Sequence, residues 1–245
     1  MHRSMLRLPA VLMMLCGATA VWAFSTGPPV TRTNAPALGI YPAETNCTSC
    51  HSGSPLNDPN GSVQILDIPY RYIPGQSYPL RLRLIYSLAD TTGASNPKWG
   101  FELTAINPLD GKGAGTLVLP NPGAGPGYPD SLLIKTSTSG TFSSSLRQYI
   151  EQSIFSTRTD QPSPAEWTFN WVAPSVSPGK VRFYVSGNAT NGTGSTSGDH
   201  VFTGSDSTDV YNPAVPATSP TTTAALLLLL VSVGAGALLV RRRPA

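Results

Sequence analysis

The sequence predicts an all-β domain, built as an antiparallel sandwich, with a targeting segment at each end of the chain. Between residues 62 and 204, short runs alternate apolar and polar side chains with period two, as half-buried strands do. Clusters of Gly, Pro, Asn and Ser separate these runs, and no long helix is indicated there. About 150 residues are ample for one hydrophobic core, so a single domain is expected.

Residues 1–23 have the features of a secretory signal peptide. Two arginines precede an apolar run, residues 8–22, and cleavage is expected after Ala23. Cys16 leaves with this leader, because Leu15 stands where a lipoprotein signal needs a small residue. All four methionines also lie in the leader, so the mature chain has none.

The C-terminal residues 224–245 form the second targeting segment. Their first 17 residues are apolar, just enough for a helix to span a bilayer, and three arginines follow. Arginines tend to stay cytoplasmic, so we expect a transmembrane anchor with the domain on the outer side of the membrane. The alternative is that a sorting enzyme recognises and removes this tail. In that case too the domain lies on the outer side of a membrane. The Ser-, Thr- and Pro-rich residues 205–223 are expected to form a stalk.

The basic character of the chain comes from its two ends. The sequence has 16 Lys and Arg residues and 13 Asp and Glu residues. Five of the arginines lie in the leader and the tail, so 11 basic residues remain against 13 acidic ones, a formal charge of −2. No basic patch points to nucleic acid as a partner.

The alternating runs define the expected strands in order. The run 78–86 is typical, with apolar side chains and arginines alternating. The stretch 147–154 is less regular, and a single helical turn is its alternative. The expected strands are 63–67, 78–86, 99–106, 116–119, 132–136, 147–154, 166–172, 180–185 and 201–203. The aromatic residues expected to fill the core are Trp99, Trp167, Phe169, Trp171, Phe183 and Tyr184.

The segment 24–61 is expected to be extended, and it contains the most informative motif of the chain. Cys47 and Cys50 are the only cysteines left after removal of the leader, and His51 follows directly, giving C-x-x-C-H. This is the attachment signature of a c-type haem, in which two thiols form thioethers to one porphyrin edge. The adjacent imidazole then becomes the proximal iron ligand. The sequence therefore predicts one covalent haem c, held by Cys47, Cys50 and His51.

Three other uses of this motif stay open. A Cys47–Cys50 disulfide suits an oxidising compartment, although so short a ring constrains the unfolded chain little. A redox-active pair usually sits at a helix start in an α/β fold, which this sequence does not predict. A zinc ion would need His51 and His200 besides the thiols, and the neighbouring Cys50 and His51 would strain a tetrahedral site.

The sixth ligand of such an iron cannot be methionine, because the mature chain has none. His200 is the only other histidine of the mature chain, so His51–His200 ligation is one expectation, with a lower potential than His/Met ligation. A solvent-exposed His200 and a five-coordinate iron are the alternative. Asp199, Asp206 and Asp209 fit no calcium-loop spacing and are expected in solvated turns.

Four stretches resemble the landmarks of reeler (reelin-type) domains. They are Tyr72–Tyr78, Trp99–Leu103, Trp171–Pro174 and Phe183–Ala189. The chain is most similar to the bacterial branch of this family, in which C-x-x-C-H precedes the domain and a variable anchor follows it. The resemblance covers roughly residues 40–205 and implies an immunoglobulin-like sandwich. Animal reeler domains carry disulfides for which this chain lacks the cysteines, so their adhesive or matrix roles do not follow from the resemblance.

These features together predict a membrane-anchored monohaem c-type protein of the bacterial cell envelope, outside the cytoplasm. Its expected role is electron transfer or redox sensing with a partner protein. The competing class is a surface adhesion or matrix module, in which Cys47 and Cys50 form a disulfide and the sandwich binds a protein or glycan. An enzyme comes third, because no acid/base partner for peroxidatic chemistry is identifiable in the sequence.

Overall fold

The computed structural model describes residues 27–87, 97–119 and 131–212. The chain divides into two compact units, residues 1–210 and 211–245, and every element below belongs to the first. The predicted signal peptide, residues 1–23, and the predicted anchor, residues 224–245, lie outside the described residues. In the part of the chain that is described, no helix combines the length and apolar character needed to cross a membrane.

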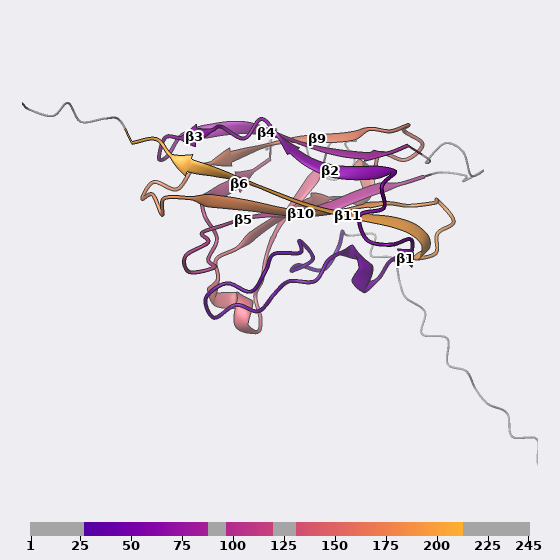
Figure 1. The fold of residues 1–245 in the computed structure, drawn as a ribbon, viewed down its shortest axis with the longest axis horizontal. Helices are drawn as coiled ribbons and strands as arrows, with labels where there is room; N and C mark the ends of the chain where they lie inside the picture. The colour runs from indigo at the N-terminus through magenta and orange to yellow at the C-terminus, as the bar shows by residue number, and fades with distance from the viewer. Residues whose placement is uncertain (1–26, 88–96, 120–130, 213–245) are drawn as a thin grey trace, which may run out of the picture. The chain divides into compact units, whose positions relative to one another are not determined.

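Eleven strands in the described residues form two sheets (Figure 1). The seven-stranded sheet has the order β1-β11-β10-β5-β8-β7, with β3 also paired to β11, and the four-stranded sheet has the order β2-β4-β9-β6. The strands of the larger sheet are β1 (Ser52–Gly53), β3 (Arg71–Tyr72), β5 (Trp99–Ile106), β7 (Leu132–Thr136), β8 (Gln148–Gln152), β10 (Val181–Ala189) and β11 (Ser197–Val210). Those of the smaller sheet are β2 (Gly61–Leu66), β4 (Ser77–Tyr86), β6 (Thr116–Val118) and β9 (Ala165–Val172).

The strand pairings are antiparallel except for the short β1 and β3, which pair parallel with β11. The predicted all-β sandwich is thus confirmed. Three short 3₁₀ turns complete the described elements: η1 (Cys47–Ser49), η2 (Thr141–Ser144) and η3 (Ile154–Ser156).

The main core lies between the two sheets and is built from the alternation that the sequence shows. Trp167, Phe169 and Trp171 follow one another at every second position of β9, and each is at most 1% exposed. The Trp167 ring lies 4.8 Å from that of Phe101, and Trp171 meets Phe183 edge-on at 5.1 Å. Aromatic contacts between the facing sheets therefore fix how the sheets pack.

Two of the sequence predictions need correction in length or type. Residues 148–152 form strand β8, so the alternative of a helical turn for 147–154 is wrong over most of that stretch. β11 runs for 14 residues rather than the predicted 201–203, and the predicted stalk therefore starts too early, because residues 205–210 are strand. Gly and Asp are poor strand formers, yet β11 pairs with β10 from His200 to Thr208 and with β1 and β3 at its ends, and this pairing outweighs that preference.

Tyr184 is buried, but not in the core for which it was predicted. It neighbours Phe183 on β10 and so points to the opposite, outer face of the larger sheet. There it packs with Ile106 and Ala35 in a second apolar cluster. The segment 27–51, the N-terminal (indigo) part of the ribbon, covers this outer face (Figure 1).

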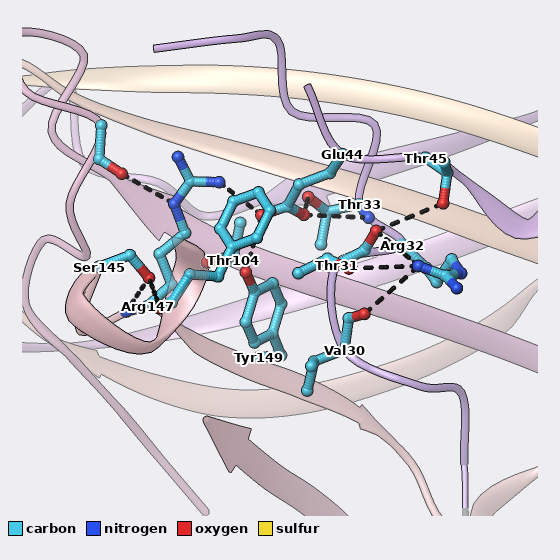
Figure 2. A network of polar contacts seen from close by, with 12 residues as sticks. Val30, Thr31, Arg32, Thr33, Glu44, Thr45, Thr104, Ser145, Arg147 and Tyr149 are labelled. Atoms are coloured by element: carbon cyan, nitrogen blue, oxygen red, sulfur yellow. Dashed lines mark hydrogen bonds and ion pairs between the residues drawn. The ribbon is translucent and has the colours of Figure 1, made fainter. Parts of the chain in front are cut away.

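A buried ion pair fastens this N-terminal segment to the sheet (Figure 2). Arg147 Nη1 donates to Glu44 Oε1 at 2.5 Å, and neither side chain is exposed. Tyr149 Oη donates to the same oxygen at 2.7 Å, and Thr33 Oγ1 donates to the other at 2.5 Å. Because these bonds are made over the outer face of the sheet, the segment that carries the C-x-x-C-H motif is folded onto the domain.

Candidate functional site

One tight turn gathers the three residues of the motif. Asn46 caps η1 by accepting from the Thr48 amide at 2.9 Å, as short polar side chains do at helix starts. The amides of Cys50 and His51 both donate to the Cys47 carbonyl, at 3.2 and 2.9 Å. Cys47, Cys50 and His51 consequently line one pocket. Residues that hold one haem together would have to lie close to one another in this way.

Cys47 is packed against β10. Its amide donates to Ser186 Oγ at 3.2 Å, and the Ser186 hydroxyl donates to Cys47 Sγ at 3.2 Å. Burial raises the pKa of the Cys47 thiol to about 12, against the lowering effect of the Ser186 hydrogen bond. This site favours an uncharged sulfur, whereas a redox-active cysteine pair needs a thiolate of lowered pKa.

His51 is held by a buried carboxylate. Its Nδ1 lies 2.6 Å from Asp199 Oδ2, and the Asp199 side chain is fully buried. The other Asp199 oxygen accepts from the Asn191 amide at 3.0 Å. A carboxylate on Nδ1 places the ring proton there and leaves Nε2 as the nitrogen that can bind a metal, which is how metal-binding histidines are usually oriented. The prediction that Asp199 lies in a solvated turn is therefore wrong. Asp206 and Asp209 are exposed as predicted, but they lie in strand β11 rather than in turns.

Strand pairing brings His51 to Asp199 across the length of the chain. β1 follows His51 directly and pairs with β11, Gly53 lying opposite Asp199. Gly53 has a φ of 139°, and a Cβ on it would lie 2.5 Å from the Gly198 Cα. Only glycine allows the two strands to approach so closely while the chain makes this turn.

The pocket beside the motif has a volume of about 170 Å³. Pro28 and Pro29 contribute apolar wall, and Asn188 from β10 contributes a buried Oδ1 with no hydrogen-bond partner in the described residues. Arg32 and Lys98 also line it. The pocket thus combines an apolar surface with unused polar groups, which is the composition of a ligand site.

The structure does not bring His200 into this pocket. His200 follows Asp199 on β11, so its side chain lies on the other face of the sheet. Its Nδ1 lies 2.8 Å from Asp58 Oδ2, its Nε2 lies 2.8 Å from Tyr86 Oη, and its ring stacks on Tyr86 at 4.1 Å. The His51–His200 ligand pair is therefore not assembled in this conformation, because both ring nitrogens of His200 are engaged elsewhere.

Ser54, His200 and Asp58 follow one another as the three residues of a hydrolytic triad do, but they cannot act as one. Ser54 Oγ lies 3.3 Å from Nε2, with Asp58 on the opposite nitrogen. However, the nearer Tyr86 hydroxyl occupies the single lone pair of Nε2. The arrangement ties the loop after His51 to β11 and β4 and leaves no base to activate Ser54.

Two buried carboxylates lie in the sheet beneath the N-terminal segment. Ser186, Glu102 and Glu151 face one another across β10, β5 and β8. Glu102 Oε1 accepts from the Arg32 amide at 2.9 Å, while burial raises the pKa of Glu102 well above its ordinary value. Burial also raises the pKa of Glu151 to about 7, although the ammonium of Lys135 opposes that shift.

Cys47 and Cys50 are free thiols in the structure. Among the described residues, no three His, Cys, Asp or Glu side chains are grouped as they would be around a metal ion.

The sequence reasoning missed Asp199, Ser186 and Asn188 as parts of this site. Ser186 and Asn188 could have been found, because they alternate with Val185, Gly187 and Ala189 and so mark a polar outer face on a strand that should be buried.

No family model and no curated protein matches this chain. Several solved structures are similar at low identity. The human F-spondin reeler domain (fragment 1) is 14% identical, covering 66% of this chain and 92% of its own, with a TM-score of 0.33. The Reelin-N domain of F-spondin is also 14% identical, covering 68% of this chain and 96% of its own, with a TM-score of 0.34.

AvmM, which catalyses macrocyclization in alchivemycin A biosynthesis, is 11% identical. The match covers 66% of this chain and 94% of AvmM, with a TM-score of 0.33. Reeler domains are thus among the structures that this chain is similar to. At these identities and TM-scores the similarity concerns the fold alone.

Proposed function

We propose that this protein carries one covalent haem c and serves as an electron carrier or redox sensor. Cys47 and Cys50 would attach the porphyrin, and His51 would be the proximal iron ligand. The observation that carries the proposal is the arrangement of His51: it shares one pocket with both thiols, and Asp199 holds its Nδ1 so that Nε2 is left for the iron.

The residues present fit such a group. A thioether is uncharged, and burial of Cys47 beside Ser186 favours an uncharged sulfur there. Asp199 fixes the orientation of the imidazole and increases its basicity toward a metal. When bound, haem supplies a one-electron couple, whose potential the protein tunes through the axial ligand, hydrogen bonds and burial.

The size of the pocket favours electron exchange over chemistry on an enclosed substrate. Sites that enclose a whole drug-sized ligand measure about 300–1,000 Å³. The pocket beside Cys47 measures about 170 Å³ and would leave a porphyrin partly exposed to a partner protein. A redox protein outside the cytoplasm is therefore the expected partner, with the domain anchored through residues 224–245.

The proposal is tested by attachment of the cofactor to the full chain. The protein is expressed in a bacterial host with a cytochrome c maturation system, and its mature form is studied by intact mass spectrometry and in-gel haem staining. We expect added porphyrin mass for the wild type and for the control Ser49→Ala, which changes one of the two residues between the cysteines. The double variant Cys47→Ala/Cys50→Ala should carry none.

The opposite result has a defined meaning. A wild-type mass without porphyrin, reduced only by the two hydrogens of a Cys47–Cys50 disulfide, would remove the haem proposal. It would leave the surface adhesion or matrix module as the remaining hypothesis.

A further inference from the structure

The described residues that line the pocket include basic side chains but no acidic one. Arg32 comes from the N-terminal segment and Lys98 from the residue before β5, so two separate parts of the chain place positive charge at the same pocket. Two carboxylates bond to residues of the pocket: Asp199 bonds to His51, and Glu102 Oε1 accepts from the Arg32 amide. The pocket is thus basic at Arg32 and Lys98 and apolar at Pro28 and Pro29.

Arg32 is held in place by its backbone while its side chain keeps donors unused. Its amide donates to Glu102 Oε1 at 2.9 Å. Its Nη1 donates to the Thr31 carbonyl and hydroxyl at 3.2 Å each (Figure 2). Nε is buried and has no hydrogen-bond partner among the described residues. A buried guanidinium donor left in this way is costly unless an acceptor binds to it.

Lys98 has a similarly fixed backbone and a free side chain. Its amide donates to Thr190 Oγ1 at 3.0 Å, and its carbonyl accepts from the Thr190 amide at 2.9 Å. In the described residues its ammonium forms no salt bridge, and the residue is exposed. The charge therefore stands at the pocket without a counter-ion among the described residues.

We infer that Arg32 and Lys98 form a subsite for the carboxylate groups of the bound tetrapyrrole, namely the haem propionates. This inference rests on the proposed function. A porphyrin is an apolar ring that bears two carboxylates, and the pocket offers apolar wall beside two cations. Arginine is suited to grip a carboxylate with two donors, and lysine supplies a point charge. The two cations also lower the free energy of the reduced iron relative to the oxidised iron, because the reduced form carries one positive charge less.

The test is the midpoint potential of the haem-loaded full chain, measured by spectroelectrochemistry for Arg32→Gln, Lys98→Gln and the double variant. Each substitution should lower the potential, shifting the oxidised-to-reduced ratio at fixed ambient potential by roughly tenfold per charge removed. The shifts should add in the double variant. Arg32→Lys should stay closer to the wild type than Arg32→Gln.

The control is Arg182→Gln on the same β10 that carries Asn188. Arg182 is exposed and lies six residues along the strand from Asn188, about 20 Å away at ~3.3 Å per residue. Its substitution should leave the potential unchanged. Circular dichroism and the melting temperature identify any variant that fails to fold, and Arg32→Lys keeps the test decisive in that case.

Two negative outcomes are distinguishable. In the first, haem is attached normally but the Arg32 and Lys98 variants keep the wild-type potential. This result overturns the propionate subsite and leaves the proposed function standing. A wild type that carries no haem overturns both.

Discussion

His51 Nδ1 and Asp199 Oδ2 lie 2.6 Å apart, although 148 residues separate them in sequence. The next residue on β11, His200, makes a second histidine–aspartate pair with Asp58 at 2.8 Å. Two consecutive residues of one strand therefore hold the chain on both sides of β1, one from each face of the sheet. The loop that carries the motif is fixed by these two pairs.

Replacement of Asp199 by asparagine tests the first pair. Hydrogen bonds to a charged group are worth about 1.5–3 kcal/mol, so Asp199→Asn should lower the free energy of unfolding in urea by that amount. In the haem-loaded protein it should also raise the midpoint potential, because a less basic imidazole favours the oxidised iron less. The control Asp206→Asn, on the same strand but exposed, should change neither quantity. Equal effects of the two substitutions would contradict the role given to Asp199.

His200 is expected to matter for stability and not for the haem. His200→Ala leaves the buried Asp58 carboxylate and the Tyr86 hydroxyl without their partner, at a cost of about 1–3 kcal/mol in the free energy of unfolding. The visible spectra of the oxidised and reduced haem should keep their wild-type spin state. A change of spin state on this substitution would show that His200 reaches the iron after all.

For the Glu44–Arg147 ion pair under the N-terminal segment, replacing one partner should lower the free energy of unfolding more than replacing both. Arg147→Met leaves Glu44 as an uncompensated buried carboxylate, which typically costs about 3–5 kcal/mol. In Glu44→Gln/Arg147→Met no charge stays buried, and the loss in unfolding free energy should be smaller than that of Arg147→Met alone. A double-mutant cycle in urea provides the measurement. Additive effects of the two single substitutions would exclude the coupling.

Glu151 should make the domain less stable as the pH rises from acid to neutral. Its pKa of about 7 in the folded chain lies above the ordinary 4.5, so the folded state binds this proton more tightly than the unfolded state does. The stabilisation is fully present below pH 4.5 and is lost as the pH rises through 7. At 1.36 kcal/mol per pKa unit the change is about 3 kcal/mol.

Urea unfolding of Glu151→Gln across this pH range should show a smaller slope than the wild type. Glu102 contributes in the same direction, so Glu102→Gln/Glu151→Gln should flatten the profile further. The control Glu166→Gln lies on the smaller sheet beside Arg83, with its side chain 32% exposed, and should preserve the slope. An unchanged slope in the double variant would refute this origin of the pH dependence.

Much of the sandwich could be predicted from local pattern, and the site only in part. β5 and β7 have the bounds that the alternation indicates, because each buries one face against the other sheet. The grouping of Cys47, Cys50 and His51 at one pocket could also be expected, since they lie within five consecutive residues; their role in holding a haem stays a prediction.

Asp199, the partner of His51, had no such local signal. Asp199 stands among Ser and Gly residues that suggest a turn, and its burial depends on a parallel pairing of β1 with β11. The covering of the outer face by residues 27–51 was equally invisible, because an irregular segment has no period. Glu44 and Arg147, which fasten it, are 103 residues apart.

The packing of Cys47 against Ser186 of β10 has a consequence for the order of events during biogenesis. A chain made from its N-terminus exposes both thiols long before β10 and β11 exist. During that interval they lie on unstructured polypeptide, open to any enzyme that would couple a cofactor to them. Arrival of the last two strands then packs Cys47 against Ser186, so a maturation factor that works on the nascent or unfolded protein would meet both thiols before that packing forms.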